Sequence, residues 1–287
     1  MRILSNCHTH TTHCDGKTPA EDTVLAALGK GFRSLGFTSH APQHFDLPYA
    51  VRPDREGDYI REIRALADKY RSRITIRCGI ERDLFSCADV YPYDYFIASV
   101  HYLPCGAEMP AVDGSPECLA EAVRGFYGGS GLRAVRAYYS LLAAYARAWR
   151  PPVIGHFDLI KKNNAALGLF DENDPAYMEA VFEALKAIRE AGSLLEVNTG
   201  GMARKVVAET YPSAAVLRMW RGMGGGVTVS SDCHDARFLD YAFDQVPDIL
   251  SGAGFDRVFV LGTGKALWEE VPLDAPAAPS TGAEQSY

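Results

Sequence analysis

The segment from residue 7 to residue 16 holds the first side chains in this chain whose types and spacing suggest chemistry. His8 and His10 are two residues apart, so on an extended backbone both imidazoles point to the same face. Asp15 follows in the same loop, and Gly16 after it permits a sharp turn. Imidazoles and carboxylates gathered at a strand end are typical metal ligands. We therefore expect a metal site here if similar residues follow other strands.

Histidines and acidic residues do recur at or just past the ends of apolar runs. The full set of potential ligands is His8, His10, Asp15, His40, Glu81, His101, His156, Asp232 and His234. Of the 8 histidines in the chain, only His13 and His44 are outside this set, and both lie a few residues from a member. None falls on an expected helix, where solvated surface histidines would also occur. The recurrence predicts that these residues share one metal-binding site.

Apolar runs that resemble short strands alternate with helical patterns, and these elements must position the ligands. Strands are expected near residues 3–4, 34–39, 74–80, 95–100, 153–155, 193–197, 226–229 and 257–261. Helices are expected near residues 18–31, 55–70, 132–148, 175–191, 213–223 and 236–241. Strands separated by helices pair in parallel, so this α/β pattern predicts a closed barrel with its site at the carboxyl ends of the strands. A doubly wound open sheet is the alternative, but it would gather ligands at one switch point.

The chain is expected to form one catalytic domain over residues 1–271. Residues 103–132 interrupt the alternation because they are rich in glycine, proline and acidic residues. We expect a long excursion there, with a short helix near 118–124, and such loops are often lids or binding loops. Residues 272–287 are rich in proline, alanine and serine, which predicts a disordered tail.

Composition limits the classes of partner and compartment. The net charge of −7 argues against a general nucleic-acid-binding protein, although a local basic pocket for phosphate stays open. Since no apolar run is long enough for a membrane span and no secretory signal follows Met1, we expect a cytoplasmic protein with reduced thiols. Cys7, Cys14 and Cys233 lie beside ligands, but without a Cys-x-x-Cys pair they are expected to be buried filler. A monomer or small homo-oligomer is expected, with no nucleic-acid or membrane partner.

The segments around the potential ligands, taken in chain order, resemble the polymerase and histidinol phosphatase (PHP) superfamily of metal-dependent phosphoesterases. The matching stretches are His8-Thr9-His10, Asp15-Gly16, Thr38-Ser39-His40, Gly79-Ile80-Glu81, Ser99-Val100-His101, Gly155-His156-Phe157-Asp158, Glu196-Val197-Asn198 and Ser230-Ser231-Asp232-Cys233-His234. The histidinol-phosphate phosphatase branch is the most similar. The stretches that indicate this branch are Ser39-His40-Ala41-Pro42, Gly79-Ile80-Glu81, Phe126-Tyr127-Gly128-Gly129 and Tyr138-Tyr139.

The resemblance implies a distorted (β/α)7 TIM-like barrel with three divalent metal ions, for which this N and O donor set suits Zn, Mn or Fe. By position, the first ion would be held by His8, His10, Glu81 and Asp232, the second by Glu81, His101 and His156, and the third by Asp15, His40 and His234. Glu81 would bridge two of the ions. Glu81, Asp232 and His234 are the residues expected to act in catalysis.

The chemistry expected of such a site is phosphate ester hydrolysis. Clustered divalent ions would cancel the charge of a phosphate dianion, and a metal-bridging hydroxide would attack phosphorus in line. Phosphate oxygens that do not contact metal need other donors, and Arg204 is the first candidate, followed by Lys161. Asn198 either orients the substrate or caps the next element. His44 and Asp158 are candidates for protonating the leaving oxygen, and the alternative for both is a plain loop residue.

The predicted function is a metal-dependent phosphomonoesterase that hydrolyses L-histidinol phosphate to L-histidinol and phosphate in histidine biosynthesis. One alternative is a PHP phosphoesterase acting on nucleotides, nucleic-acid ends or phosphotyrosine. Another is a catalytically silent metal-binding regulatory domain, which should lack several ligands, whereas all nine are present here. The sequence determines neither the metal nor the role of His13, for which a surface position is expected.

Overall fold

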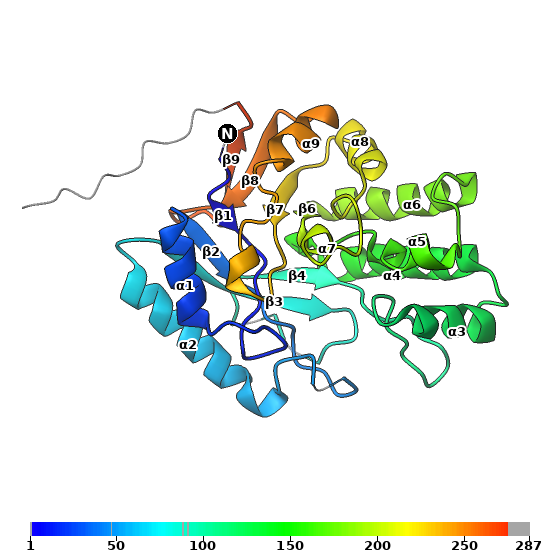
Figure 1. The fold of residues 1–287 in the computed structure, drawn as a ribbon, viewed down its shortest axis with the longest axis horizontal. Coiled ribbons are helices and arrows are strands. Elements are labelled where there is room, and N and C mark those ends of the chain that lie inside the picture. The colour runs from blue at the N-terminus through cyan, green and yellow to red at the C-terminus, as the bar shows by residue number, and fades with distance from the viewer. Residues whose placement is uncertain (1, 47, 88, 91, 275–287) are drawn as a thin grey trace, which may run out of the picture.

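Short buried strands form the centre of the protein in the computed structural model, which describes residues 2–46, 48–87, 89–90 and 92–274 (Figure 1). The strands are β1 (Ser5–Asn6), β2 (Ser34–Phe37), β3 (Thr75–Asp83), β4 (Tyr95–Ser99), β5 (Val153–Ile154), β6 (Leu194–Asn198), β7 (Val227–Ser230), β8 (Arg257–Leu261) and β9 (Trp268–Pro272). The α-helices are α1 (Ala20–Gly29), α2 (Glu56–Tyr70), α3 (Pro116–Phe126), α4 (Gly131–Trp149), α5 (Asn164–Leu167), α6 (Pro175–Ala191), α7 (Gly200–Ala203), α8 (Ala214–Gly222) and α9 (Val246–Gly252). Short 3-10 turns occupy Pro53–Arg55, Leu159–Lys161 and Ala236–Phe238.

The strands follow one another around the sheet in chain order. β1 to β8 pair in parallel with their neighbours, and β9 pairs antiparallel with β8. The ring closes where Thr9, just after β1, pairs with Cys233, just after β7, and His10 N donates to Cys233 O at 3.0 Å. At the other end of the seam, Leu261 N of β8 donates to Ser5 Oγ at 3.1 Å. The predicted single-domain, distorted (β/α)7 barrel is therefore confirmed, with β8 and β9 at its seam.

Helices cover the outside of the barrel because each presents one apolar stripe to it. In α4, Ala134, Tyr138, Leu142 and Tyr145 are all buried and recur at helical spacing. This helix packs against α6, whereas α1 and α2 lie on the other side of the barrel (Figure 1). The carboxyl ends of the strands are left uncovered by these helices, as a barrel active site requires.

The expected elements match the structure best where the apolar pattern is long. β3 continues to Asp83, beyond the expected end at 80, because its last residues pair with β4. The helix expected over 236–241 is wrong, since only a 3-10 turn over Ala236–Phe238 forms there. α9 and β9 were not expected, because they are short and each contains a proline and charged residues.

The excursion over 103–132 is ordered rather than a continuous loop. Tyr102 pairs antiparallel with Ala111, and the chain turns at Gly106, whose φ is +66°. α3 follows, with Ser115 capping it by accepting from Cys118 N at 3.3 Å. The short helix expected near 118–124 is thus confirmed and is longer than expected, and the rest of the excursion is a small hairpin beside the end of β4.

The C-terminal boundary also differs from the expectation. Pro272 ends β9, and Leu273 N donates to Asp256 O at 2.9 Å, so these two residues of the expected tail belong to the folded part. The disorder predicted for the remainder falls on residues 275–287, which lie outside the described residues. All seven cysteines are free thiols, as predicted. None of the described helices is both long enough and apolar enough to cross a bilayer.

Close packing in the barrel predicts a stability difference between two glycines. A Cβ at Gly36, in β2, would lie 1.9 Å from the Tyr95 hydroxyl, whereas a Cβ at Gly29, in α1, would meet nothing within 4 Å. We expect Gly36→Ala to lower the free energy of unfolding by about 1–3 kcal/mol, and the control Gly29→Ala to leave it unchanged or raise it by up to about 1 kcal/mol. Urea unfolding monitored by circular dichroism measures both, and equal effects would contradict this packing.

Candidate metal centre

The carboxylate of Glu81, on β3, lies at the centre of the carboxyl end of the barrel and is fully buried. Five imidazoles surround it, those of His8, His10, His40, His101 and His156. Its Oε1 is 2.9 Å from His156 Nε2, and its Oε2 is 2.7 Å from His40 Nδ1. These imidazoles follow four different strands, β1, β2, β4 and β5, so distant parts of the chain meet at one carboxylate.

A second carboxylate, that of Asp232 after β7, lies on one side of this centre. Its Oδ1 is 3.1 Å from His10 Nε2 and 3.7 Å from His8 Nε2. Asp232 has a positive φ of +48°, which a non-glycine residue rarely adopts. Such backbone strain is common at functional sites, and here the conformation accompanies a carboxylate directed at two imidazoles.

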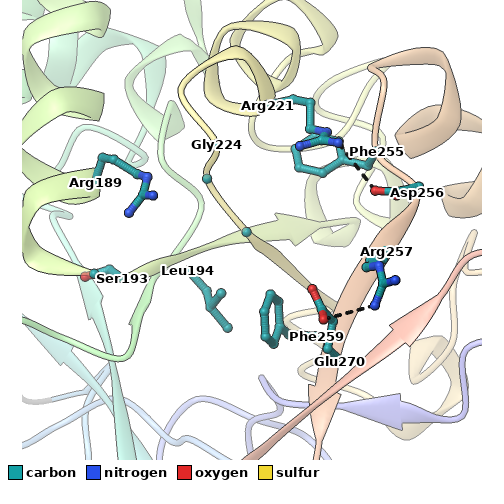
Figure 2. A pocket seen from close by; sticks show the side chains of 13 residues that line it. Arg189, Ser193, Leu194, Arg221, Gly224, Phe255, Asp256, Arg257, Phe259 and Glu270 are labelled. Atoms are coloured by element: carbon teal, nitrogen blue, oxygen red, sulfur yellow. Dashed lines mark hydrogen bonds and ion pairs between the residues drawn. The ribbon is translucent and has the colours of Figure 1, made fainter.

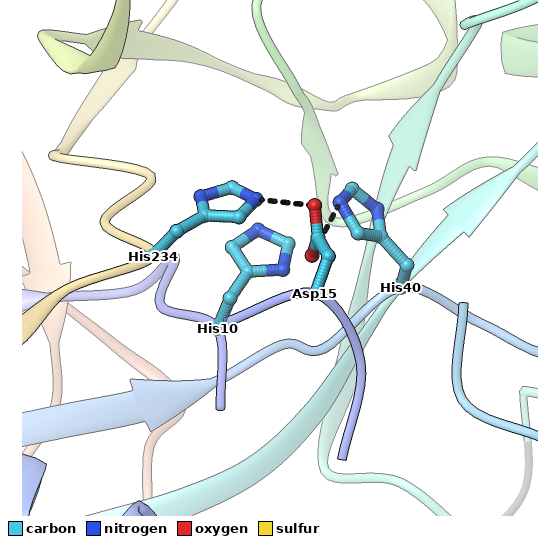
Figure 3. Close-up of side chains that lie close together, drawn as sticks. All are labelled: His10, Asp15, His40 and His234. Carbon is cyan, nitrogen blue, oxygen red and sulfur yellow. Dashed lines mark ion pairs between the residues drawn. The ribbon is translucent and has the colours of Figure 1, made fainter. Parts of the chain in front are cut away.

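Asp15 forms the third part of the cluster, beside His10, His40 and His234 (Figure 3), and its side chain is 35% exposed. Its Oδ2 is 3.3 Å from His234 Nε2, and its Oδ1 is 3.7 Å from His40 Nε2. The ring of His10 stacks on that of His234 with centroids 4.0 Å apart. Gly16 is required next to Asp15, because a Cβ there would lie 2.6 Å from the backbone N of Thr11.

Nine side chains predicted as ligands therefore form one continuous cluster. Their potential ligand atoms fall into three groups, in each of which the atoms lie within 4.8 Å of one another: His10, Asp15, His40 and His234; His8, His10 and Asp232; and His40, Glu81 and His101. These groups overlap the three expected ligand sets but differ from them in three ways: His10 and His40 each take part in two groups, Glu81 takes part in one group instead of two, and His156 is in none. His156 reaches the cluster through Glu81.

The chemistry of this donor set fits divalent metal ions. Oε2 of Glu81 is buried and accepts no hydrogen bond from any described residue, despite the imidazoles around it. His8 Nε2 and His10 Nε2 face each other at 3.1 Å. A divalent cation would satisfy these ring nitrogens and carboxylate oxygens together, and the mixture of N and O donors suits Zn, Mn or Fe.

Glu196 on β6, a buried carboxylate outside the predicted ligand set, lies behind two of these histidines. Its Oε1 is 2.5 Å from His8 Nδ1 and accepts from Ser230 Oγ at 2.5 Å. Its Oε2 accepts from His156 N at 2.7 Å. A carboxylate on the far nitrogen fixes the tautomer of an imidazole, so that Nε2 of His8 is left with a lone pair facing the cluster.

Asp83 has the same relation to His101. Its Oδ2 accepts from His101 N at 2.7 Å and lies 3.3 Å from His101 Nδ1. Tyr49 also contacts this imidazole, with its hydroxyl 3.2 Å from Nδ1. In the sequence, Asp83 and Glu196 could have been recognised as charged residues in or at the end of a buried apolar run. No local sequence pattern distinguishes Tyr49.

Burial and charge together decide the protonation of the cluster. Burial opposes ionisation of Glu81, but the imidazoles of His40 and His8 outweigh it and hold its pKa well below its usual value. Burial likewise opposes ionisation of Asp232, and Arg204 holds its pKa low. For His10, burial and the neighbouring imidazoles lower the pKa well below the usual value. The ionised carboxylates and the neutral His10 are thus in the forms that bind metals. Despite burial, neighbouring carboxylates raise the pKa of His8, His101 and His234, so a metal ion would have to displace protons from these imidazoles.

Arg204 lies at the edge of this cluster, just after α7. Its Nη2 is 3.0 Å from Asp232 Oδ2, and its Nη1 donates to Asp232 O at 3.3 Å. Its side chain is 40% exposed, compared with 6% for that of Asp232. The guanidinium therefore reaches both the cluster and solvent, as a phosphate contact would require.

Asn198 lies behind the cluster rather than at its opening. It is fully buried, and its Nδ2 donates to Glu196 Oε2 at 3.0 Å and to Asp232 Oδ2 at 3.4 Å. Its Oδ1 accepts from Gly200 N at 2.8 Å, at the start of α7. Of the two roles expected for Asn198, orienting the substrate and capping the next element, the contact with Gly200 N favours the second.

The other predicted substrate contacts lie apart from the nine residues. Lys161 is buried and pairs with Asp158 at 2.9 Å and Glu209 at 3.1 Å, so its charge is already used within the fold. His44 is exposed on the loop after β2. His13 pairs with Glu62 Oε2 at 2.5 Å, outside the cluster.

The cysteines near the ligands behave as small buried groups. Burial raises the pKa of Cys7 and of Cys233 to about 12, and that of Cys14 to about 11. Cys14 Sγ contacts His10 Nδ1 at 3.5 Å. All three are therefore thiols rather than thiolates, in agreement with their expected role as filler.

A separate hollow of about 420 Å³ lies at the opposite, amino end of β6, β7 and β8. Figure 2 shows Arg189, Arg221 and Arg257 around it, and Glu270 and Asp256 each pair with one of these arginines. None of the three candidate ligand groups among the described residues includes any residue that lines this hollow. The ligand-bearing residues are thus confined to the carboxyl end of the barrel.

The sequence of this chain is similar to those of several named proteins. A family model described as PHP domain matches residues 6–200. A protein named probable histidinol-phosphatase from Deinococcus radiodurans is 32% identical over 266 residues, which cover 88% of this chain and 95% of that protein. The histidinol-phosphatase of Bacillus subtilis is 28% identical over 264 residues, which cover 83% of this chain and 96% of that protein.

Two solved structures share the fold. One, provisionally named histidinol phosphatase, comes from Listeria monocytogenes and matches with a TM-score of 0.74 at 22% identity, covering 84% of this chain and 98% of that one. The other is the histidinol phosphate phosphatase of Lactococcus lactis in complex with zinc, L-histidinol and phosphate. It matches with a TM-score of 0.67 at 20% identity, covering 91% and 98% of the two chains. Both support the barrel architecture.

The contact between Glu196 and His8 predicts a loss of metal affinity when the charge is removed. We expect Glu196→Gln to weaken zinc binding by about 10–100-fold, because the imidazole loses the negative charge that orients it and the amide keeps only one of the two accepting oxygens. Titration of metal-free protein with zinc against a competing chelator measures this affinity. His13→Ala is the matched control and should bind as the wild type does, because the side chain of His13 contacts Glu62 and the ring of Tyr59, outside the cluster. Wild-type affinity in Glu196→Gln would refute the role of Glu196.

Proposed function

This chain belongs to the PHP domain family, and we propose from that premise that it is a phosphatase that hydrolyses L-histidinol phosphate to L-histidinol and phosphate. It is a metal-dependent hydrolase of phosphate monoesters, and its substrate is a small molecule. Relatives that carry this activity in their names align over nearly their whole length. The reaction is a step of histidine biosynthesis.

The observation that best supports this function is the position of Arg204 beside a cluster of nine residues whose side chains can bind metal. Exposure of the side chains increases from the buried Glu81 to His234 at 23% and Asp15 at 35%. Arg204, at 40%, lies on the same open side through its contact with Asp232. A phosphate group entering there would meet the cluster and a guanidinium together, which is the pair of contacts that a phosphate monoester dianion needs.

We propose that the nine residues hold three divalent ions and that Glu81, Asp232 and His234 act in catalysis. Such ions, when bound, supply positive charge to the phosphate dianion and make water acidic enough to provide hydroxide near neutral pH. Glu196 accepts a hydrogen bond from Nδ1–H of His8 and so keeps Nε2 of His8 directed at the cluster. The barrel contributes orientation, since these groups are held in place before substrate arrives.

Arg204 would bind the phosphoryl group of the substrate. Asp232 binds its Nη1 and Nη2 on one side. The exposed remainder of the guanidinium can donate to two phosphate oxygens. This arrangement would hold the phosphoryl group so that the departing alcohol points away from the cluster, toward the opening.

We further propose that the domain predicted over residues 1–271, which the folded residues Pro272 and Leu273 extend, is one catalytic domain. It would act in the cytoplasm as a monomer or small homo-oligomer without a nucleic-acid or membrane partner. The net charge of −7 supports the exclusion of nucleic acid. Binding to phosphate would then be local to Arg204 and the metal centre, not a property of the general surface.

The experiment that tests this function is phosphate release from a panel of monoesters by protein reconstituted with zinc or manganese. We expect L-histidinol phosphate to be hydrolysed much faster than nucleotides or phosphotyrosine. Glu81→Gln should reduce this turnover by about 10³-fold or more while the protein stays folded, since it removes the charge at the centre of five imidazoles. Equal rates across the panel would overturn the substrate assignment, and full activity in Glu81→Gln would overturn the site.

Arg204 allows an independent test of phosphate binding. Arg204→Ala should lower kcat/KM by about 10²–10³-fold, and Arg204→Lys should recover part of the loss, because lysine keeps the charge without the two-pronged contact. Lys205→Gln is the control, since this neighbouring side chain is exposed. Similar losses in Arg204→Ala and Lys205→Gln would argue for a general surface charge effect instead.

A further inference from the structure

The loop that follows β2 is fastened at both ends to the metal cluster. Ala41 N, at its start, donates to Glu81 O at 2.8 Å. Val51 N, at its end, donates to His40 O at 2.9 Å. Side chains from the middle of this loop can therefore reach the side of the cluster on which His40 lies.

Tyr49, in this loop, contacts two members of the cluster. Its ring lies on the imidazole of His40, with centroids 3.8 Å apart, and its hydroxyl is 3.2 Å from His101 Nδ1. His40 Nε2 is also 3.7 Å from Oδ1 of Asp15, whose side chain is 35% exposed. Tyr49 itself is only partly buried. Its ring therefore borders the side on which the cluster reaches solvent.

Phe45 extends this aromatic surface away from the cluster. Its ring packs edge-on against that of Tyr102, with centroids 4.8 Å apart, and Tyr102 packs edge-on against Tyr49 at 6.5 Å. The hydroxyl of Tyr102 donates to Asp46 Oδ2 at 2.8 Å and accepts from Gln43 Nε2 at 3.1 Å, so the loop is held in this position. We call Phe45, Tyr49 and Tyr102 the aromatic wall.

The aromatic wall has a buried base and an exposed edge. Tyr102 is 3% exposed, whereas Phe45 is 43% exposed although it is a large apolar side chain. Single exposed apolar side chains are common, but Phe45 continues an aromatic surface that begins on a metal-ligand residue. An aromatic ring is the group that such a surface would recognise, because rings pack on rings in offset or edge-to-face geometry.

A short series of contacts connects the aromatic wall with the proposed phosphate position. Arg204 Nη2 is 3.0 Å from Asp232 Oδ2, and Asp232 Oδ1 is 3.1 Å from His10 Nε2. The ring centroid of His10 is 4.2 Å from that of His40, on which Tyr49 packs. Only one carboxylate and two imidazoles therefore separate the guanidinium from the wall, and a substrate that lies over these ligands can touch both.

We propose that Phe45 and Tyr49 bind the aromatic ring of the substrate alcohol and thereby select phosphate esters of alcohols that carry such a ring. This inference rests on the proposed function, because L-histidinol phosphate has an imidazole that three carbons join to its ester oxygen. With the phosphate between the cluster and Arg204, that imidazole can extend over His40 to the aromatic wall. The loop after β2 then contributes specificity, while the strand ends contribute the chemistry.

The test compares L-histidinol phosphate with L-alaninol phosphate, which differ only in the imidazole ring, on protein reconstituted with zinc or manganese. Phe45→Ala should lower kcat/KM for the first by about tenfold, as expected when an aromatic contact is lost, and change that for the second by less than twofold. Tyr49→Leu should also reduce the preference for L-histidinol phosphate. Tyr49→Phe keeps the ring and should keep the preference.

Phe182→Ala is the matched control, because Phe182 on α6 is also 43% exposed but lies on a helix outside the barrel. It should behave as wild type on both substrates. Zinc affinity, measured against a competing chelator, should be unchanged in Phe45→Ala, since the ring of Phe45 packs on Tyr102 and not on a metal-ligand residue. This measurement separates a substrate contact from damage to the metal centre.

Equal losses on the two substrates, an unchanged preference in Phe45→Ala, weaker zinc binding in that variant, or a similar loss of preference in Phe182→Ala would overturn the role of Phe45. A preference kept in Tyr49→Leu or lost in Tyr49→Phe would overturn that of Tyr49. If Phe45→Ala does not fold, Phe45→Asn decides in its place, because it also removes the ring and asparagine suits a loop.

The proposed function can fail separately, if the wild type does not favour L-histidinol phosphate in the monoester panel. In that case 2-phenylethyl phosphate and ethyl phosphate replace the pair of substrates. Only a preference for the ring-bearing ester that Phe45→Ala abolishes would then sustain the inference.

Discussion

The buried negative charge of Glu81 is the constraint on which the rest of the structure depends. Removing an isolated carboxylate from water is unfavourable by several kcal/mol or more unless other groups compensate it. Here the compensation comes from five imidazoles on the ends of four strands, and from the cations that such a donor set binds. Because no two neighbouring segments could supply these groups alone, the strand ends must converge, and a closed barrel is the arrangement that makes them converge.

A second layer of polar contacts makes that convergence specific. β1 and β5 are only two residues long, so ladder hydrogen bonds alone hold them weakly. Glu196 connects the segment after β1, the segment after β5 and the end of β7, through His8, His156 N and Ser230. The same carboxylate orients an imidazole of the cluster. The same hydrogen bonds therefore close the barrel and orient the residues predicted to bind metal. A substitution that breaks them should affect both.

The two ends of the barrel differ in what their charges do. At the amino end, Arg221 and Arg257 lie beside Asp256 and Glu270, so the charges around the hollow are largely balanced (Figure 2). At the carboxyl end, the carboxylates lie inside and Arg204 lies at the rim, next to the opening. This separation leaves a positive edge over a cation-binding interior. In the proposed function, this edge would attract a phosphate dianion to one place without making the protein a general polyanion binder, in keeping with its net charge of −7.

The sequence by itself determined the strand and helix alternation, the barrel class and the nine residues that form the cluster, because each depends on local patterns. Apolar runs and their ends are visible in a few consecutive residues, and so are histidine pairs such as His8 and His10. Only the tertiary structure decided that Asn198 is buried behind the site and that Glu196 and Asp83 support its histidines. Those roles come from contacts between segments up to 188 residues apart, as between His8 and Glu196. Such contacts exist only once the barrel closes.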